Sequence, residues 1–276
     1  MRINAPAKIN WTLDVLGRRP DGYHQLDTLM QQISLCDEVL LEPAGAFSLR
    51  CDDPAVPVDE TNTALRAARL YFEAAGLGGG VCLHLNKRIP SEAGLGGGSA
   101  DAAAVLRGLN WLYGAYSEET LFRMALSVGA DVPFCLAGGL RRCGGVGEEM
   151  APLSPGARFF LVLAKGIKGV STGGLFRSLS LDSLFHPDTA GAAAALESGD
   201  PAVLSSHLGN SLEGPACRIC PEISTTLALL RQSGALAASM TGSGSACFGL
   251  YADESSARAA LPLLSSVPFA VLCHTL

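Results

Sequence analysis

The first forty residues alternate apolar and polar positions as β-strands do. The segments KINWTLDVLG and QLDTLMQQISL flank RRPDGYH, and DEVLLEP follows them. Asp21 and Gly22 form a good turn signal between the two segments. The pattern therefore predicts β-hairpins at the N-terminus.

Two later stretches have helical spacing of apolar residues. The first runs from Asn62 to Ala75 and is closed by Gly76. The second is opened by Ser117 as an N-cap and ends near Gly129. It leads into DVPFCLAGG, so we expect Asp131 near a break between two elements.

The pattern of helix-like and strand-like segments changes near residue 150. APLSPGA precedes the apolar strand RFFLVLAK, and after it helix-like stretches (AGAAAALESG, PAVLSSHL, PEISTTLALLRQSG) alternate with strand-like ones (GALAASM, SACFGLY, VPFAVLCHT). These patterns predict a mixed α/β (α+β) fold with two domains, residues 1–150 and 151–276.

A glycine-rich stretch, PSEAGLGGGSADAA, lies between a strand-like and a helix-like segment. Its glycines, Gly94, Gly96, Gly97 and Gly98, allow positive φ and expose backbone N–H groups. Ser99 is the expected N-cap of the helix that follows. Because helix N-termini attract anions, this loop predicts a phosphate site.

The loop does not match the common nucleotide signatures. No lysine follows it as in a Walker A motif, Ser99 stands where a Rossmann loop needs a glycine, and the protein-kinase motifs are absent. Neutral backbone N–H groups must then hold most of the phosphate.

Composition narrows the classes of partner. The 276 residues are 48% hydrophobic and 17% charged, with a formal net charge of −6, which gives no basic field for a nucleic acid. No apolar run is long enough to span a membrane, and no secretory signal is recognisable, so we expect a cytoplasmic protein.

Of the nine cysteines only Cys217 and Cys220 are closely spaced, and ordinary core or loop thiols are the favoured interpretation.

PSEAGLGGGSADAAAVL resembles the phosphate loop of the GHMP superfamily of small-molecule kinases. APAKINWTLDVLGRRPDGYHQLDTLMQQISLCDEV, GADVPFCLAGG, GVSTGGLF and MTGSGSACFGLY follow the order of one branch, the 4-diphosphocytidyl-2-C-methyl-D-erythritol kinases. The resemblance implies an N-terminal ATP-binding domain like domain 2 of ribosomal protein S5 and a ferredoxin-like C-terminal domain. It further implies transfer of the ATP γ-phosphoryl group to the substrate's 2-hydroxyl, in the non-mevalonate (MEP) pathway of isoprenoid biosynthesis.

The family pattern assigns the catalytic acid and base chemistry to Asp131 and Lys8. Asp131 would take the hydroxyl proton, and Lys8 would hold the hydroxyl and lower its pKa, or stabilise the aspartate's charge. Taken alone, however, Asp131 could be the N-cap of a short helix. Lys8 could likewise be a solvated charge on an edge strand.

The resemblance also assigns the substrate-binding residues. Tyr23 and Phe176 would enclose the cytosine, and His24 would hydrogen-bond its edge, although a phenylalanine on a helix is more often a core residue. Asn10, Thr172 and Gly242 would bind the rest of the substrate.

On the ATP side, the resemblance places Asn62 near the adenine and wraps the glycine loop around the phosphates. The loop residues are Pro90, Ser91, Glu92, Ala93, Gly94, Leu95, Gly96, Gly97, Gly98, Ser99 and Ala100. Mg²⁺ is expected with ATP, and Ser99 or Asp101 is the candidate ligand.

Three positions depart from the family pattern. Ala100 replaces a second serine, Gly166 stands where proline is common, and Glu92 brings a carboxylate to the loop entrance. Because a carboxylate would repel ATP, we expect Glu92 to point to solvent.

Two alternatives remain open on the sequence: a sister GHMP kinase of the homoserine or mevalonate class, and an inactive nucleotide-binding regulator. GRRPDGYH argues against the first, and the presence of both Lys8 and Asp131 against the second. We expect a monomer or weak homodimer whose partner is a small molecule with a cytidine diphosphate moiety.

Overall fold

Strands β1 (Arg2–Arg18) and β2 (His24–Ala44) form the hairpin that the alternating pattern predicts. The connection turns at Gly22, which has a φ of +88° and donates its N–H to the carbonyl of Arg19 at 3.0 Å. The middle of β1 is buried without interruption, because both faces of the strand are covered. The computed structural model describes all 276 residues.

The chain packs as two compact units, and neither is one continuous stretch. The first comprises Met1–Ala7, Leu35–Ser91 and Gly96–Gly138, and the second comprises Lys8–Ser34, Glu92–Leu95 and Gly139–Leu276. Strands β1 and β2 therefore contribute residues to both units. The domain boundary at residue 150 stays a prediction.

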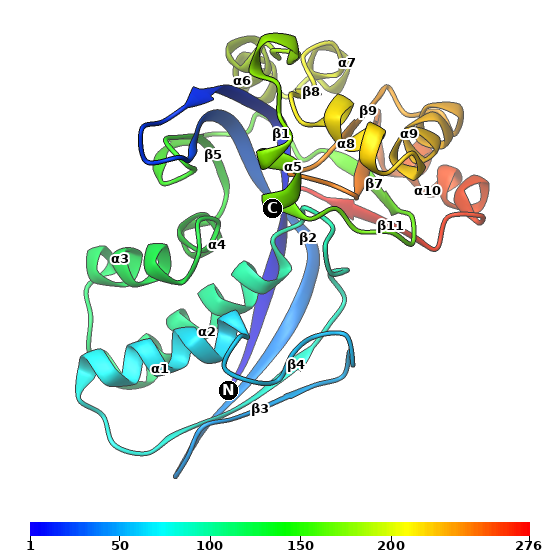
Figure 1. Ribbon diagram of the computed structural model, residues 1–276. Coiled ribbons are helices and arrows are strands. Elements are labelled where there is room, and N and C mark those ends of the chain that lie inside the picture. Colours follow the sequence, from blue (N-terminus) through cyan, green and yellow to red (C-terminus); the bar gives the residue numbers. More distant parts are fainter. The chain divides into compact units, whose positions relative to one another are not determined.

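The first unit is a sheet with helices. Its elements are β3 (Ser48–Cys51), α1 (Thr63–Ala75), β4 (Gly80–Asn86), α2 (Gly97–Tyr113), α3 (Glu118–Val128) and α4 (Val132–Ala137). Strand β4 pairs antiparallel with the second half of β2 and parallel with β3. Helices α1 and α2 pack side by side (Figure 1). The predicted helix boundaries at Asn62, Gly76, Ser117 and Gly129 are confirmed.

The second unit contains a second, four-stranded sheet. Besides its parts of β1 and β2, the second unit has the elements β5 (Leu140–Gly144), β6 (Glu149–Leu153), β7 (Phe160–Lys165), α5 (Thr172–Arg177), η1 (Leu181–Ser183), α6 (Thr189–Ser198), α7 (Pro201–Ser205), β8 (Gly209–Asn210), α8 (Glu213–Ile219), α9 (Glu222–Gln232), β9 (Ala237–Met240), β10 (Cys247–Tyr251), α10 (Glu254–Ala260), η2 (Leu261–Leu264) and β11 (Phe269–His274).

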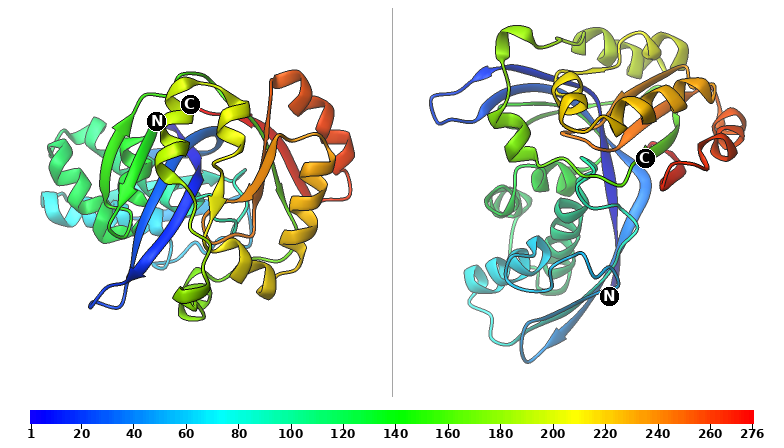
Figure 2. Two further views of the ribbon diagram at one scale, coloured as in Figure 1. Left: turned by 90° about the horizontal axis from the view of Figure 1, so that it is seen from above. Right: turned by 45° about the vertical axis from the view of Figure 1, so that its right-hand side comes forward.

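The four-stranded sheet has the order β11-β7-β10-β9, and all its pairs are antiparallel. In chain order the strands run 4-1-3-2, with helices before the second and the fourth strand, which is the ferredoxin-like arrangement that the resemblance implies. Helix α9 packs on these strands (Figure 2). The hairpin of β5 and β6 was not predicted, since its arginines and proline give no apolar alternation.

The core of the second unit combines segments far apart in the chain. Leu13 of β1 is buried in one cluster with Val162 of β7, Ile223 of α9 and Tyr251 of β10. On β1, Trp11 makes edge-to-face contacts with the rings of Phe159 and Phe248, at 5.6 and 5.5 Å between ring centroids. This packing anchors the strand that carries the first candidate site residues.

None of the helices is both long and apolar enough to cross a membrane. All nine cysteines are free thiols, including Cys217 and Cys220 at the C-terminal end of α8.

Candidate active site

Part of the glycine loop lies against the turn that joins β9 and β10. Gly94 has a φ of +71°, and a Cβ there would clash with the carbonyl oxygen of Thr241. Ala246 donates its backbone N–H to the carbonyl of Ala93 at 3.2 Å. The close approach explains why the loop needs a glycine at position 94.

The first turn of α2 begins earlier than the sequence predicts. Gly96, in the left-handed conformation with a φ of +72°, is the N-cap, and the helix starts at Gly97, so the expectation that Ser99 caps it is wrong. Gly97 and Gly98 have no side chains that disfavour this start, and Ser99 lies within the first turn. A glycine cap offers the first N–H groups no side-chain acceptor, which suits an anion there.

Lys8 is a buried cation at the centre of a hydrogen-bond network. The residue is 3% exposed, and its Nζ donates to Oδ1 of Asn10 at 2.7 Å. Its backbone N–H donates to the carbonyl of Leu95 in the glycine loop at 3.0 Å. The alternative of a solvated edge charge is therefore wrong.

Asn10 joins Lys8 to the β9–β10 turn. Its Oδ1 accepts the N–H of Gly242 at 3.0 Å, and its own N–H donates to Oγ1 of Thr241 at 3.0 Å. Its Nδ2 donates to Oγ1 of Thr28 at 2.8 Å. Both ends of the amide are thus engaged within the second unit.

Asp131 stands at the N-cap position of α4 but does not act as a cap. Its φ and ψ are −84° and −10°, and its side chain makes no capping hydrogen bond. Helix capping therefore does not account for the carboxylate. Asp131 belongs to the first unit and Lys8 to the second, and their joint action stays a prediction.

The predicted cytidine-binding residues include one aromatic pair. The rings of His24 and Phe176 lie 5.1 Å apart at an angle of 39°, while Tyr23 is 65% exposed at the tip of the hairpin. Burial, and then the charge of Arg18, lowers the pKa of His24, which favours the neutral imidazole. The hydroxyl of Thr172 is 2.6 Å from that of Ser243, so α5 is attached to the β9–β10 turn.

Comparisons with known proteins show the family and the fold of this chain. The models of the GHMP kinase N-terminal and C-terminal domains match residues 62–139 and 192–264. A 4-diphosphocytidyl-2-C-methyl-D-erythritol kinase of Clostridium botulinum (strain Alaska E43 / Type E3) is 40% identical over 92% of this chain and 91% of its own. One of Carboxydothermus hydrogenoformans is 43% identical over 94% and 91%.

The chain belongs to the 4-diphosphocytidyl-2-C-methyl-D-erythritol kinase family. It is similar to a crystal structure of a 4-(cytidine 5'-diphospho)-2C-methyl-D-erythritol kinase, with a TM-score of 0.86 and 40% identity over 100% of this chain and 99% of that one. A homoserine kinase from Cytophaga hutchinsonii has a TM-score of 0.76 at 20% identity over 100% and 94%, and so shares the fold. The two-domain GHMP kinase fold, the ATP-dependent phosphotransferase class and ATP use are thereby established.

Asn62 has a clear structural role in this family member. Its Oδ1 accepts the N–H of Ala64 at 2.9 Å and so caps α1, and its Nδ2 donates to the carbonyl of Pro57 at 2.8 Å. The residue is 7% exposed. Its contact with the adenine stays a prediction.

The departures from the family pattern have physical explanations. Glu92 is exposed, as predicted, and Ala100 is buried in α2, where a serine hydroxyl would face the core. A Cβ at Gly166 would clash with Oε2 of Glu222, so a larger residue at this position requires the Glu222 side chain to move.

A buried charge cluster lies at the two ends of the phosphate loop, and the sequence analysis did not find it. Nζ of Lys87 donates to Oδ2 of Asp37 and, at 2.6 Å, to Oδ2 of Asp101. Oδ1 of Asp37 also accepts the N–H groups of Arg88 and Ile89, at 2.6 and 2.8 Å. The cluster attaches the segment entering the loop and the helix leaving it to β2.

The charges in this cluster do not cancel. Burial alone would lower the pKa of Lys87, but the attraction of Asp101 and Asp37 outweighs it and raises that pKa. Burial raises the pKa of Asp101 to about 7, against the attraction of Lys87. One ammonium cannot balance two buried carboxylates, and Asp37 has the additional backbone donors.

Of the two candidate magnesium ligands, Ser99 fits better. It lies in the first turn of α2 and is partly exposed, whereas Asp101 is 2% exposed and paired with Lys87. Mg²⁺ keeps several waters and binds largely through the phosphates of the nucleotide, and Ser99 as its protein ligand stays a prediction.

Proposed function

We propose that this protein transfers the γ-phosphoryl group of ATP to the 2-hydroxyl of 4-diphosphocytidyl-2-C-methyl-D-erythritol. The observation that carries the proposal is the buried ammonium of Lys8. Its Nζ donates to Oδ1 of Asn10, which also accepts the N–H of Gly242 in the β9–β10 turn. The backbone N–H of the same lysine donates to the carbonyl of Leu95 in the glycine loop. Family membership supports the same reaction.

The chemistry needs a proton acceptor and positive charge near the attacking oxygen. In the proposed step the hydroxyl oxygen forms a bond to the γ-phosphorus, the bond from phosphorus to the bridging oxygen of ADP breaks, and Asp131 takes the hydroxyl proton. Lys8 holds the hydroxyl and stabilises the developing negative charge. No covalent enzyme intermediate is required, because phosphoryl transfer depends mainly on position and charge.

The loop of residues 90–100 would cradle the triphosphate with the backbone N–H groups of its residues other than Pro90. The N-terminus of α2 would contribute its positive end. Ser99 would hold Mg²⁺, which supplies charge neutralisation between the β- and γ-phosphates. The role of Asn62 at the adenine is part of this proposal.

The cytidine end would be recognised by the hairpin tip and α5. Tyr23 supplies an exposed ring for stacking, and Phe176 supplies a second ring beside His24. A neutral His24 can both donate and accept a hydrogen bond at the base edge. Asn10, Thr172 and Gly242 would contact the methylerythritol end. A cytoplasmic location and a monomeric or weakly dimeric state belong to the same proposal.

The test measures ADP release by purified protein with ATP and magnesium, comparing 4-diphosphocytidyl-2-C-methyl-D-erythritol with homoserine, mevalonate and galactose. We expect turnover of the cytidylyl substrate and rates near background for the other three. Turnover of homoserine or mevalonate in its place would show a sister kinase. ADP release with none of them, together with ATP binding, would show a regulator.

A further inference from the structure

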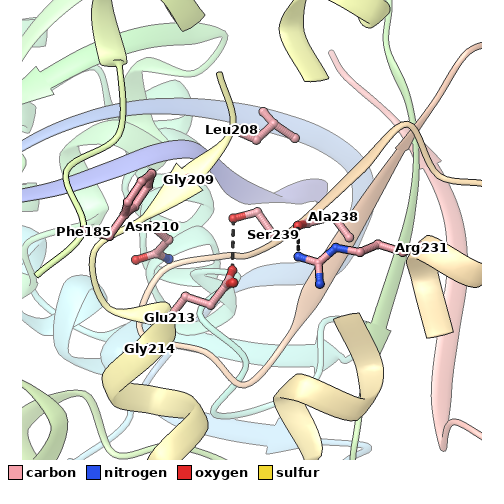
Figure 3. A pocket seen from close by; sticks show the side chains of 9 residues that line it. All are labelled: Phe185, Leu208, Gly209, Asn210, Glu213, Gly214, Arg231, Ala238 and Ser239. Atoms are coloured by element: carbon pink, nitrogen blue, oxygen red, sulfur yellow. Dashed lines mark hydrogen bonds between the residues drawn. The ribbon is translucent and has the colours of Figure 1, made fainter. Parts of the chain in front are cut away.

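A hollow of about 320 Å³ is lined by residues of β8, α8, α9 and β9 (Figure 3). Asn210, Glu213 and Ser239 line it, with the exposed ring of Phe185 at its edge. The side chains of Asn210, Glu213 and Arg231 already hydrogen-bond backbone groups of the chain. Two residues that line the hollow, Asn210 and Glu213, therefore hold the end of β9 and the start of the β9–β10 turn.

Asn210, at the end of β8, uses its whole amide on backbone groups. It is 4% exposed, and its Nδ2 donates to the carbonyls of Met240 at 2.9 Å and Gly242 at 2.8 Å. Its Oδ1 accepts the N–H of Leu212 at 2.9 Å. Glu213 adds one bond, since its Oε2 accepts the N–H of Met240 at 2.9 Å.

The same turn is held from its other side by the site network. Gly242 donates its N–H to Asn10, whose Oδ1 also accepts from Nζ of Lys8. Gly242 is left-handed, with a φ of +56°, and a Cβ there would lie 2.8 Å from the carbonyl oxygen of Gly94. The N–H and the carbonyl of this one residue are thus fixed by two different side chains.

We propose that Asn210 is a positioning residue for phosphoryl transfer. By holding the carbonyls of Met240 and Gly242, it fixes the peptides on both sides of the Thr241–Gly242 peptide, which carries the Gly242 N–H. That N–H fixes the amide of Asn10, and the amide fixes the ammonium of Lys8. The proposal rests on the proposed function only in that its effect is read on the kinase reaction.

Asn210→Asp tests the first link. The variant has the same shape, loses both N–H donors and places a carboxylate against two carbonyl oxygens. We expect kcat to fall by about 10- to 100-fold, because a misplaced reacting group costs on that order. The KM for ATP should change much less, since none of the residues assigned to ATP binding is hydrogen-bonded to the side chain of Asn210.

Asn110→Asp is the matched control for a loss that is only structural. Asn110 on α2 also donates its Nδ2 to a carbonyl, that of Tyr116 at 2.9 Å, and accepts the N–H of Tyr116 at 3.0 Å. Both variants should lose thermal stability, but Asn110→Asp should keep the wild-type kcat at a temperature where circular dichroism shows both folded. An unchanged kcat for Asn210→Asp, or an equal loss in the control, would overturn the proposal.

A double-mutant cycle with Asn10→Ala tests the path to Lys8. If Asn210 acts through Asn10, then Asn210→Asp should reduce kcat little further once Asn10 is alanine. Additive losses would overturn the path. The wild-type substrate panel separates the two proposals: turnover of a sister substrate refutes the proposed function, and the same cycle is then run with that substrate.

Discussion

Asp131 and Lys8 show what burial and capping geometry add to a sequence motif. A buried lysine costs desolvation energy and is retained where its ammonium has specific acceptors, as Lys8 has in Asn10. Asp131 begins α4 without capping it, so its carboxylate is not needed to start the helix. Solvation at a strand edge therefore does not explain Lys8, and helix capping does not explain Asp131.

Asp131→Asn should abolish most activity without affecting the fold. The amide keeps the size of the carboxylate but cannot take the hydroxyl proton, so we expect kcat to fall by about 10²- to 10⁴-fold. The measurement is steady-state ADP release, with circular dichroism as the check on folding.

The matched control is Asp188→Asn at the N-cap of α6. Asp188 accepts the N–H of Gly191, asparagine caps helices equally well, and the ion pair of Asp188 with His207 is at the surface. The kcat should therefore stay unchanged, and the melting temperature should change little. A rate for Asp131→Asn within about twofold of wild type would remove this residue from the mechanism.

The phosphate loop depends on elements that precede and follow it. Strand β2, the end of β4 and helix α2 meet at the cluster of Lys87, Asp37 and Asp101, whose side chains are nearly inaccessible to solvent. The glycine-rich loop is thus attached at both ends by buried charged groups, although it contains several glycines itself.

Lys87→Met should destabilise the protein strongly. It leaves two buried carboxylates without their cation, and breaking a buried ion pair in this way costs about 3–5 kcal/mol of unfolding free energy. Urea denaturation measures the loss. Lys168→Met, at an exposed lysine, is the control and should change stability by about 0.5 kcal/mol or less. Equal stability of the two variants would show that the cluster does not hold the loop ends.

The charge cluster also makes the stability of the whole molecule depend on pH. The pKa of Asp101 is raised from 3.8 to about 7 by folding. The stability that comes from its protonated form is therefore complete below pH 3.8 and is lost as the pH rises through 7.

Asp101→Asn should remove this dependence. The difference in unfolding free energy between wild type and Asp101→Asn should shift against the wild type by at most about 1.4 kcal/mol for each pH unit, between the two pKa values. Urea denaturation at several pH values from about 5 to 8 measures it. A difference that stays constant over that range would show that Asp101 is already ionised.

Secondary structure and the phosphate loop could be predicted because their signals are local. Asn62, Ser117 and the closing glycines mark helix ends through hydrogen bonds within a few residues. The prediction that Ser99 caps α2 was wrong for a related reason. Serine is the better cap by residue type, but the two glycines before it let the helix start at Gly97. The short strand β8 and helix α8 were not predicted, because so few residues carry no periodicity.

The sequence by itself determined the local elements, the flexible glycine loop and the family motifs, since each depends on neighbouring residues. Only the tertiary structure decided which polar side chains meet. Asn10 and Gly242 are 232 positions apart, and Lys87 and Asp37 are 50 apart. Such contacts depend on how strands align and which faces are buried, and no short stretch of sequence encodes that alignment.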